Sequence, residues 1–278
     1  MNRCTEIVLK NIHGTTKATT IRNQKPIKIL TPKSHETNCH LTTTNYGGGF
    51  VQGDHVRIHL EANENTTCVL TSQANNRVYK SEDRRTCAIH QEIILENNAR
   101  FFLLNDPLVL QKDSNLKQYL KCNMADDSSF VLLDWVSVGR VKSNENSEFD
   151  SFYSEAEVTY NGKKILLDKF SLDPKTSNCN SPGILANHTT FVNLYMIGNT
   201  KRALTVLNHC KIIVEKWLST ESKPQPTFVV SADTINPNLH ILRASATETL
   251  ILWKFVKEIG TIFTEKEQLK FNPYERKY

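Results

Sequence analysis

The segment "IHLEANENTTCVLTSQ" (58–73) joins a short strand-like stretch, a polar turn and a second strand of bulky residues. Two later segments share this pattern, "IILENNARFFLLND" (93–106) and "CNMADDSSFVLLDW" (122–135). Asn, Asp and Ser in the turns tolerate positive φ, and the apolar runs that follow are typical of buried strands. The copies recur about every 30 to 35 residues, a period typical of stacked repeats. The pattern predicts a mainly β chain whose strands stack in a helix-like, solenoid-like arrangement.

A hairpin is expected after the repeats. The segment 154–173 alternates on both sides of Asn161-Gly162, a dipeptide that favours a type I′ turn. Further strands are expected at 188–198 and 227–232, because both are rich in β-branched and aromatic residues.

Two helices are expected near the C-terminus, at 200–218 and 246–263, where apolar residues recur every three to four positions. We expect one domain over 1–278, with a β-rich part (1–198), a helix-containing part (199–265) and a polar tail (266–278) that is extended after Asn272-Pro273. Strands do not alternate with helices, which argues against a doubly wound parallel sheet.

The composition is that of a globular protein. The 278 residues are 39% hydrophobic and 23% charged, and the mean hydropathy is −0.42. No apolar run approaches the roughly 18 residues that span a bilayer, and the first residues lack the apolar core of a signal peptide. Seven scattered cysteines without a CxxC pair indicate reduced thiols rather than disulfides or zinc. We therefore expect a cytoplasmic protein without a membrane partner.

The net charge of +5 is concentrated in residues 1–46, which contain seven Lys and Arg and two Glu. Diffuse lysines without interleaved aromatic residues are a poor footprint for nucleic acid. We interpret this charge as a solvated basic edge and expect no nucleic-acid partner.

The segment "GGGFVQGD" (47–54) resembles a phosphate-binding loop at first sight. A dinucleotide fingerprint, however, places its glycines between a strand and a helix. Here the following "HVRIHLEA" alternates like a strand, so no helix N-terminus is available for a phosphate. A glycine-rich corner that needs positive φ or close packing is the structural alternative.

Four motifs in order resemble one known family. "YGGGFVQGD" (46–54) is followed by "LTSQANNRVYKS" (70–81) and by "VLLDWVSVGR" (131–140), and "QKPIKILTP" (24–32) precedes them. This order is similar to that of the urease accessory proteins called UreD or UreH. The motif residues are Gly47, Gly48, Gly49, Gly53, Gly139 and Arg140. The proline-rich segment that the family has after the second repeat is reduced here to Pro107, and the last residues match only loosely.

The resemblance implies a β-stacked fold with two C-terminal helices and no catalytic activity. It implies a scaffold that assembles with UreF-type and UreG-type accessory proteins on apo-urease, as part of a dimeric hetero-oligomer. UreG-type proteins are GTPases that bring nickel, and the present chain would guide it into the urease active site. No tightly bound cofactor is implied, only transient Ni²⁺. The alternative is a non-catalytic cytosolic β-solenoid binding protein unrelated to urease.

A nickel passage needs weak, replaceable ligands, for which carboxylates suit better than several thiolates or imidazoles. The candidates are Asp54 after the glycine corner, Asp134 in an apolar strand and Asp168 at the end of "ILLD". Each has a structural alternative. Asp54 is also placed to cap its turn, and Asp134 and Asp168 are also candidates for ion pairs with Arg140 or Lys169.

Further polar residues alternate along the second motif, among them Gln73 and Tyr79. They are candidates for the passage, although the polar face of an ordinary strand explains them as well. His55 and His59 share one strand face, a spacing that metal sites use but that solvated strands also show. We expect no tight metal site.

Two other functional classes are not favoured. The chain has no G-x-S-x-G, no H-E-x-x-H and no clustered His/Cys set that would indicate an enzyme. A carbohydrate-binding or carbohydrate-cleaving solenoid would show aromatic platforms or paired acids, whereas aromatic residues are only 8% of this chain. Apolar surface left exposed on the two helices is where we expect a helical UreF-type partner to dock.

Overall fold

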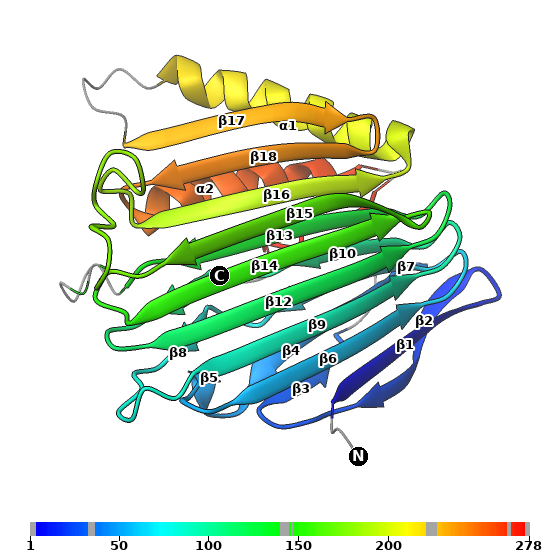
Figure 1. Cartoon of the computed structure of the whole chain (residues 1–278). Coiled ribbons are helices and arrows are strands. Elements are labelled where there is room, and N and C mark those ends of the chain that lie inside the picture. Colours follow the sequence, from blue (N-terminus) through cyan, green and yellow to red (C-terminus); the bar gives the residue numbers. More distant parts are fainter. Residues whose placement is uncertain are drawn as a thin grey trace.

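The computed structural model describes residues 4–32, 37–139, 145, 147–220, 227–265 and 268–275. These residues form a mainly β protein with two large sheets and two α-helices in the C-terminal part (Figure 1). The chain winds through about four turns of a β-solenoid, which confirms the predicted fold class. Within the described part of the chain, neither helix combines the length and apolar content needed to cross a membrane.

The first sheet has parallel strands in its centre and antiparallel strands at both edges. Its strands in spatial order are β15 (Lys163–Leu172), β14 (Ser151–Tyr160), β12 (Asn115–Met124), β9 (Cys87–Leu95), β6 (His55–Ala62), β1 (Thr5–Ile12) and β2 (Thr15–Arg22). The edge pair β14 and β15 is the predicted hairpin, and Asn161 and Gly162 both have positive φ in its turn, as a type I′ turn requires.

The second sheet is parallel over β4, β7, β10 and β13 and antiparallel beyond them. Its main strands in spatial order are β17 (Phe228–Asn236), β18 (Leu239–Ala246), β16 (Thr190–Gly198), β13 (Ser129–Ser137), β10 (Arg100–Leu104), β7 (Thr67–Ser72), β4 (Cys39–Asn45) and β3 (Ile27–Leu30). Three short strands continue it along a third side, β5 (Gly49–Phe50), β8 (Asn76–Val78) and β11 (Leu108–Leu110).

The three predicted repeats are three successive solenoid coils, and their turns stack. Asn65, Asn98 and Asp127 have φ of 58°, 56° and 56° at equivalent places. Asn98 Nδ2 donates to Asn65 Oδ1 at 2.7 Å, and the Asn98 backbone N–H donates to the carbonyl of Asp126 at 3.1 Å. The Asn and Asp residues are therefore needed both for their left-handed backbone and for contacts between coils.

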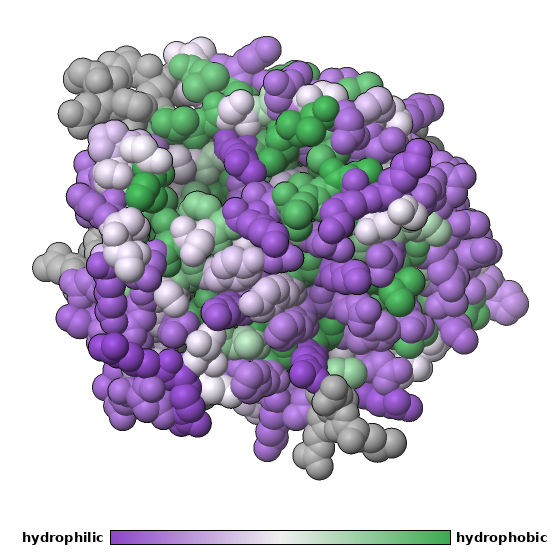
Figure 2. Space-filling model, viewed as in Figure 1, coloured by the Kyte–Doolittle hydropathy of each residue, from purple (hydrophilic) through white to green (hydrophobic). Residues whose placement is uncertain are grey.

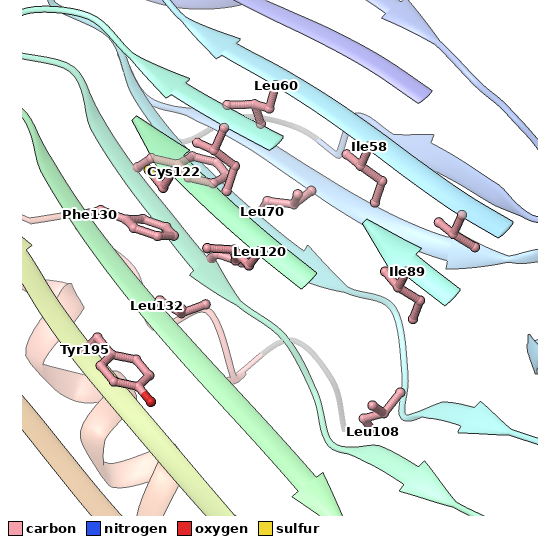
Figure 3. Close-up of a cluster of buried hydrophobic side chains, with 14 of the residues drawn as sticks. Ile58, Leu60, Leu70, Ile89, Leu108, Leu120, Cys122, Phe130, Leu132 and Tyr195 are labelled. Carbon is pink, nitrogen blue, oxygen red and sulfur yellow. The ribbon is translucent and has the colours of Figure 1, made fainter. Parts of the chain in front are cut away.

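The interior between the sheets holds the larger hydrophobic core. Figure 3 shows Leu70, Phe130 and Leu132 of the second sheet together with Ile58 and Leu120 of the first. Because the apolar strands of the second sheet are buried on both faces, they read as continuous apolar runs rather than as alternation.

A smaller core lies between the outer face of the second sheet and the helices α1 (Thr200–Thr220) and α2 (Thr249–Ile259). Leu133 and Trp135 point to this side, whereas Leu132 points into the solenoid. The predicted apolar stripe of the first helix is confirmed, since Leu207 and Cys210 are buried in this core.

Two predictions at the C-terminal end were wrong. The last helix begins at Thr249 rather than at 246, because residues up to Ala246 belong to β18, and a 3₁₀ turn (Gly260–Thr264) follows it. The tail is also not a polar, extended segment over its described part. Phe271 and Tyr274 are buried in the smaller core, and the Phe271 ring packs against His40 of β4. Burial of two aromatic rings favours a chain that folds back onto the body.

Candidate interior passage

A row of polar residues crosses the inner face of the second sheet. Thr43 and Ser72 are register partners on β4 and β7, and Asp134 pairs with Asn193 on β16. Asn105 follows Leu104, whose partners are Thr71 and Leu133, so it lies level with Ser72 and Asp134. Successive coils therefore place one polar side chain each at the same height of an otherwise apolar interior.

A cavity of about 90 Å³ lies along this row, between the two sheets. Its volume has room for several water molecules, and its wall supplies the polar partners that buried water needs. Its polar lining residues are Thr43, Asn76, Gln91, Asn105, Asp106, Gln118, Asp134, Ser154 and Glu155.

Asp134 faces the cavity from β13 and is held by the first sheet. Gln118 Nε2 lies 3.2 Å from Asp134 Oδ1 and 2.8 Å from Ser154 Oγ. Burial raises the pKa of Asp134 to about 6, with a further contribution from the negative charge of Asp168, while the hydrogen bond from Gln118 opposes the rise. The carboxylate thus carries a charge that its surroundings only partly compensate.

Asp168 lies on β15 near Asp134 and bridges to the second sheet. Its Oδ2 accepts a hydrogen bond from the hydroxyl of Tyr195 and forms an ion pair with Arg243 Nη2 at 2.7 Å. Burial, together with this carboxylate, raises the pKa of Tyr195. Lys169, the alternative partner considered for Asp168, pairs with Glu155 at 3.3 Å instead, and Arg140 lies outside the described residues.

Asp54 lies outside the cavity lining. Its Oδ2 accepts a hydrogen bond from the Val51 backbone N–H at 2.9 Å, which closes the turn at the glycine corner. The structural alternative, a turn cap, accounts for this contact.

The glycines of this corner serve two needs. Gly47, Gly48 and Gly53 have φ between 77° and 81°, and Gly139, further along the chain, has φ of 117°. Gly49 instead permits a close approach, because a Cβ there would lie 2.5 Å from the carbonyl oxygen of Arg77. Strand β6 follows the corner, so the glycines precede a strand and not a phosphate-binding helix.

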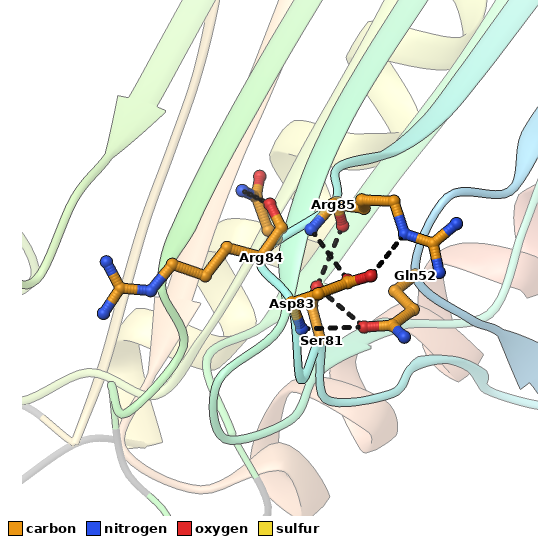
Figure 4. A network of polar contacts seen from close by, with 6 residues as sticks. Gln52, Ser81, Asp83, Arg84 and Arg85 are labelled. Atoms are coloured by element: carbon orange, nitrogen blue, oxygen red, sulfur yellow. Dashed lines mark hydrogen bonds and ion pairs between the residues drawn. The ribbon is translucent and has the colours of Figure 1, made fainter.

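Figure 4 shows the polar contacts that hold this corner. Gln52 Oε1 accepts a hydrogen bond from Ser81 Oγ at 3.1 Å, and Arg85 Nε pairs with Asp83 at 2.6 Å. The Gln52–Ser81 contact joins the glycine motif to the second motif, and the Arg85–Asp83 pair holds the loop that follows.

The remaining candidates also lie away from the cavity lining. Gln73 is exposed, and the Tyr79 hydroxyl donates to the carbonyl of Gly47 at 3.2 Å. His55 is exposed on the outer face of the first sheet, and His59 is held there between Glu61 and Glu92 at 2.9 and 3.2 Å. Among the described residues, no three His, Cys, Asp or Glu side chains are grouped to hold a metal ion.

Sequence reasoning missed Gln118, Asn105, Tyr195 and Arg243. A signal for Asn105 was present, because each apolar run of the repeat ends in one polar residue at the same position. For the other three no local signal exists, because their roles depend on partners 16 to 75 residues away.

The second sheet thus carries a row of hydroxyl, amide and carboxyl groups, ending in Asp134, across an otherwise apolar interior. The family model described as "UreD urease accessory protein" matches residues 4–276, nearly the whole chain. The chain belongs to the UreD family. The UreD protein of Cytophaga hutchinsonii is 31% identical over 272 residues, covering 96% of this chain and 95% of its own length. The UreD protein of Actinobacillus pleuropneumoniae is 23% identical over 253 residues, covering 88% and 90%.

UreD proteins are non-catalytic urease accessory proteins, and membership makes this chain one of them. The alternative of a binding protein unrelated to urease is therefore wrong. The family resemblance inferred from four motifs is confirmed over nearly the full chain.

Proposed function

We propose that this UreD protein is a scaffold and conduit for nickel, and that it passes Ni²⁺ through its interior into apo-urease. In this proposal it acts in a hetero-oligomer with a UreF-type protein and a UreG-type GTPase, and GTP hydrolysis by the latter drives delivery. The observation that carries the conduit is the polar row that leads through the apolar interior to Asp134, whose charge interacts with that of Asp168.

The chemistry of the lining supports transit rather than storage. Amide, hydroxyl and carboxylate oxygens with water are weak ligands for a late first-row divalent ion, and they exchange readily. Asp134 and Asp168 supply negative charge where desolvation of the cation costs most. No thiolate takes part in this lining: the cysteines of the described chain are free, and none lines the cavity.

The helical layer is the proposed docking side for the UreF-type partner. Leu204, Ile212 and Leu218 of α1 and Leu250 of α2 are 39%, 64%, 50% and 59% exposed. Exposed apolar side chains on adjacent helices offer a helical partner area to bury. Their other faces are already occupied by the smaller core, which holds the two helices rigidly for docking.

The test is nickel loading of urease in cells that express the urease and accessory genes with or without this chain. We expect urease from cells lacking the chain to be present, empty of nickel and inactive, and to be restored by the wild-type chain. Urease that carries its nickel without this chain would contradict the proposal.

Asp134→Asn then separates a conduit from a scaffold. It removes the charge from the cavity while leaving an oxygen for the Gln118 amide. We expect the variant to assemble normally but to load urease more slowly. Normal nickel loading by this variant would contradict the conduit and leave only the scaffold part of the proposal.

A further inference from the structure

A second hollow lies on the outside of the molecule. A groove of about 300 Å³ lies between β15 and the uncovered face of β16, β18 and β17. Asp168 and Arg243 line this groove, whereas Asp134, which lies close enough to Asp168 for their charges to interact, lines the interior cavity. On the face shown in Figure 2, hydrophobic side chains gather mostly in the upper half, the region of these four strands. Asp168 therefore stands between the interior and this outer surface.

Three elements meet at the Asp168 carboxylate. Asp168 comes from the edge strand of the first sheet, whereas Tyr195 on β16 and Arg243 on β18 belong to the second. Tyr195 is 2% exposed and packs at the end of the inner core, where Figure 3 places it beside Leu132. Its hydroxyl fixes the carboxylate from the interior side, while Arg243 reaches it from the groove.

Arg243 differs from Tyr195 in how firmly it is held. Its side chain is 58% exposed, against 23% for that of Asp168. An ion pair that is exposed on one side is weak and exchanges readily with solvent. The polar row of the second sheet also continues to it, because Asn193, the partner of Asp134, pairs with Arg243 in the next strand.

We propose that this groove is a mouth of the passage and that Arg243 closes it. Its guanidinium occupies the cation position at Asp168 in the chain alone, and a divalent cation gains access to Asp168 by displacing it. The inference rests on the proposed conduit function and assigns the closing residue, which no motif in the sequence indicated. No bond is made or broken in this exchange; one cation replaces another at a fixed carboxylate.

The test compares Ni²⁺ binding by the full-length wild-type chain and by Arg243→Gln, using equilibrium dialysis. Without the competing guanidinium, affinity for Ni²⁺ should rise about fivefold, because loss of one exposed ion pair changes a binding equilibrium by about that factor. Arg22→Gln is the matched control, because it makes the same substitution in an exposed ion pair, with Glu6 at 2.8 Å, that lines neither the cavity nor the groove. The control should bind like the wild type.

One further measurement locates the effect. The double variant Asp168→Asn/Arg243→Gln should lose the gain in Ni²⁺ affinity. Equal affinities for Arg243→Gln and Arg22→Gln at equal melting temperature would overturn the proposal, and so would a gain that persists in the double variant.

If Arg243→Gln fails to fold, Arg243→Lys provides the same comparison. Lysine offers a point charge without the planar fork of arginine, so it should hold Asp168 less well and raise affinity in the same direction. An unchanged affinity would again overturn the proposal. Ni²⁺ binding by the Arg243 variants tests the role of Arg243, whereas nickel loading of urease by Asp134→Asn tests the conduit. A failure of one proposal can therefore be distinguished from a failure of the other.

Discussion

Gln118 on β12 donates from Nε2 to Asp134 on β13, at 3.2 Å to Oδ1 and 3.4 Å to Oδ2, and thereby joins two sheets across an apolar interior. One neutral donor is a small compensation for a carboxylate in this setting, so the site costs stability when charged.

Asp134→Asn should therefore stabilise the protein at neutral pH. The pKa of Asp134 is about 6 in the folded chain and about 3.9 in an unfolded chain. The folded state binds this proton more tightly than the unfolded state does. The protonated carboxyl therefore contributes fully to the free energy of unfolding below about pH 4, and this contribution is lost as the pH rises through about 6. The advantage of the variant over wild type should grow by about 2 kcal/mol between about pH 4 and about pH 7.5.

Urea unfolding at both pH values measures this difference. Asp54→Asn is the control, because Asp54 lies in the turn outside the cavity. A difference between Asp134→Asn and wild type that does not change with pH would show that burial does not penalise this carboxylate.

Gly49→Ala should destabilise the glycine corner by about 1–3 kcal/mol through overpacking. The new Cβ would lie 2.5 Å from the Arg77 carbonyl oxygen and 2.8 Å from the Tyr79 ring. Gly183→Ala is the matched control, because nothing lies within 4 Å of a Cβ there and no positive φ is involved. Thermal unfolding of the two variants should separate them clearly; equal melting temperatures would argue against a close approach at Gly49.

Asp54→Ala should weaken the corner but leave nickel transit intact. Loss of the hydrogen bond to the Val51 N–H should cost about 1 kcal/mol. Nickel loading of urease, measured at a temperature where the variant is fully folded, should match wild type. A strong loss of nickel loading under those conditions would indicate that Asp54 takes part in nickel transit.

Ile212→Glu on α1 should weaken capture of the UreF-type partner without affecting the fold, because this side chain is 64% exposed. Ile12→Glu is the control, since Ile12 is 43% exposed at the end of β1, on the first sheet. Co-purification of the partner with each variant is the measurement. A loss with Ile12→Glu but not with Ile212→Glu would place docking on the β side instead.

Local sequence patterns predicted those parts of the fold that local chemistry decides. The Asn and Asp turns, the apolar runs and the Asn161-Gly162 hairpin each depend on a few neighbouring residues. Strand β18 was missed because "LHILRASA" packs small residues such as Ala244 and Ala246 beneath the helices, and alanine and serine carry little β propensity.

The candidate passage could be predicted only in part. Asp134 and Asp168 were identifiable as acids within or after apolar runs, and both lie near each other in the structure. Arg243 was not identifiable, because it lies 75 residues from Asp168 and has no distinctive neighbours. Such contacts depend on strand register between distant coils, which a single sequence does not reveal.

The stacked turns at Asn65, Asn98 and Asp127 have a consequence for length. Each coil adds one strand spacing of about 4.8 Å along the axis, and each brings one polar residue to the inner row. The number of coils therefore sets the distance between the two ends of the row. Insertion or removal of one whole coil would change that distance by one strand spacing and leave the remaining side chains on their faces of the sheet. Loss of a single residue within a strand would instead turn the polar residue of that coil away from the interior.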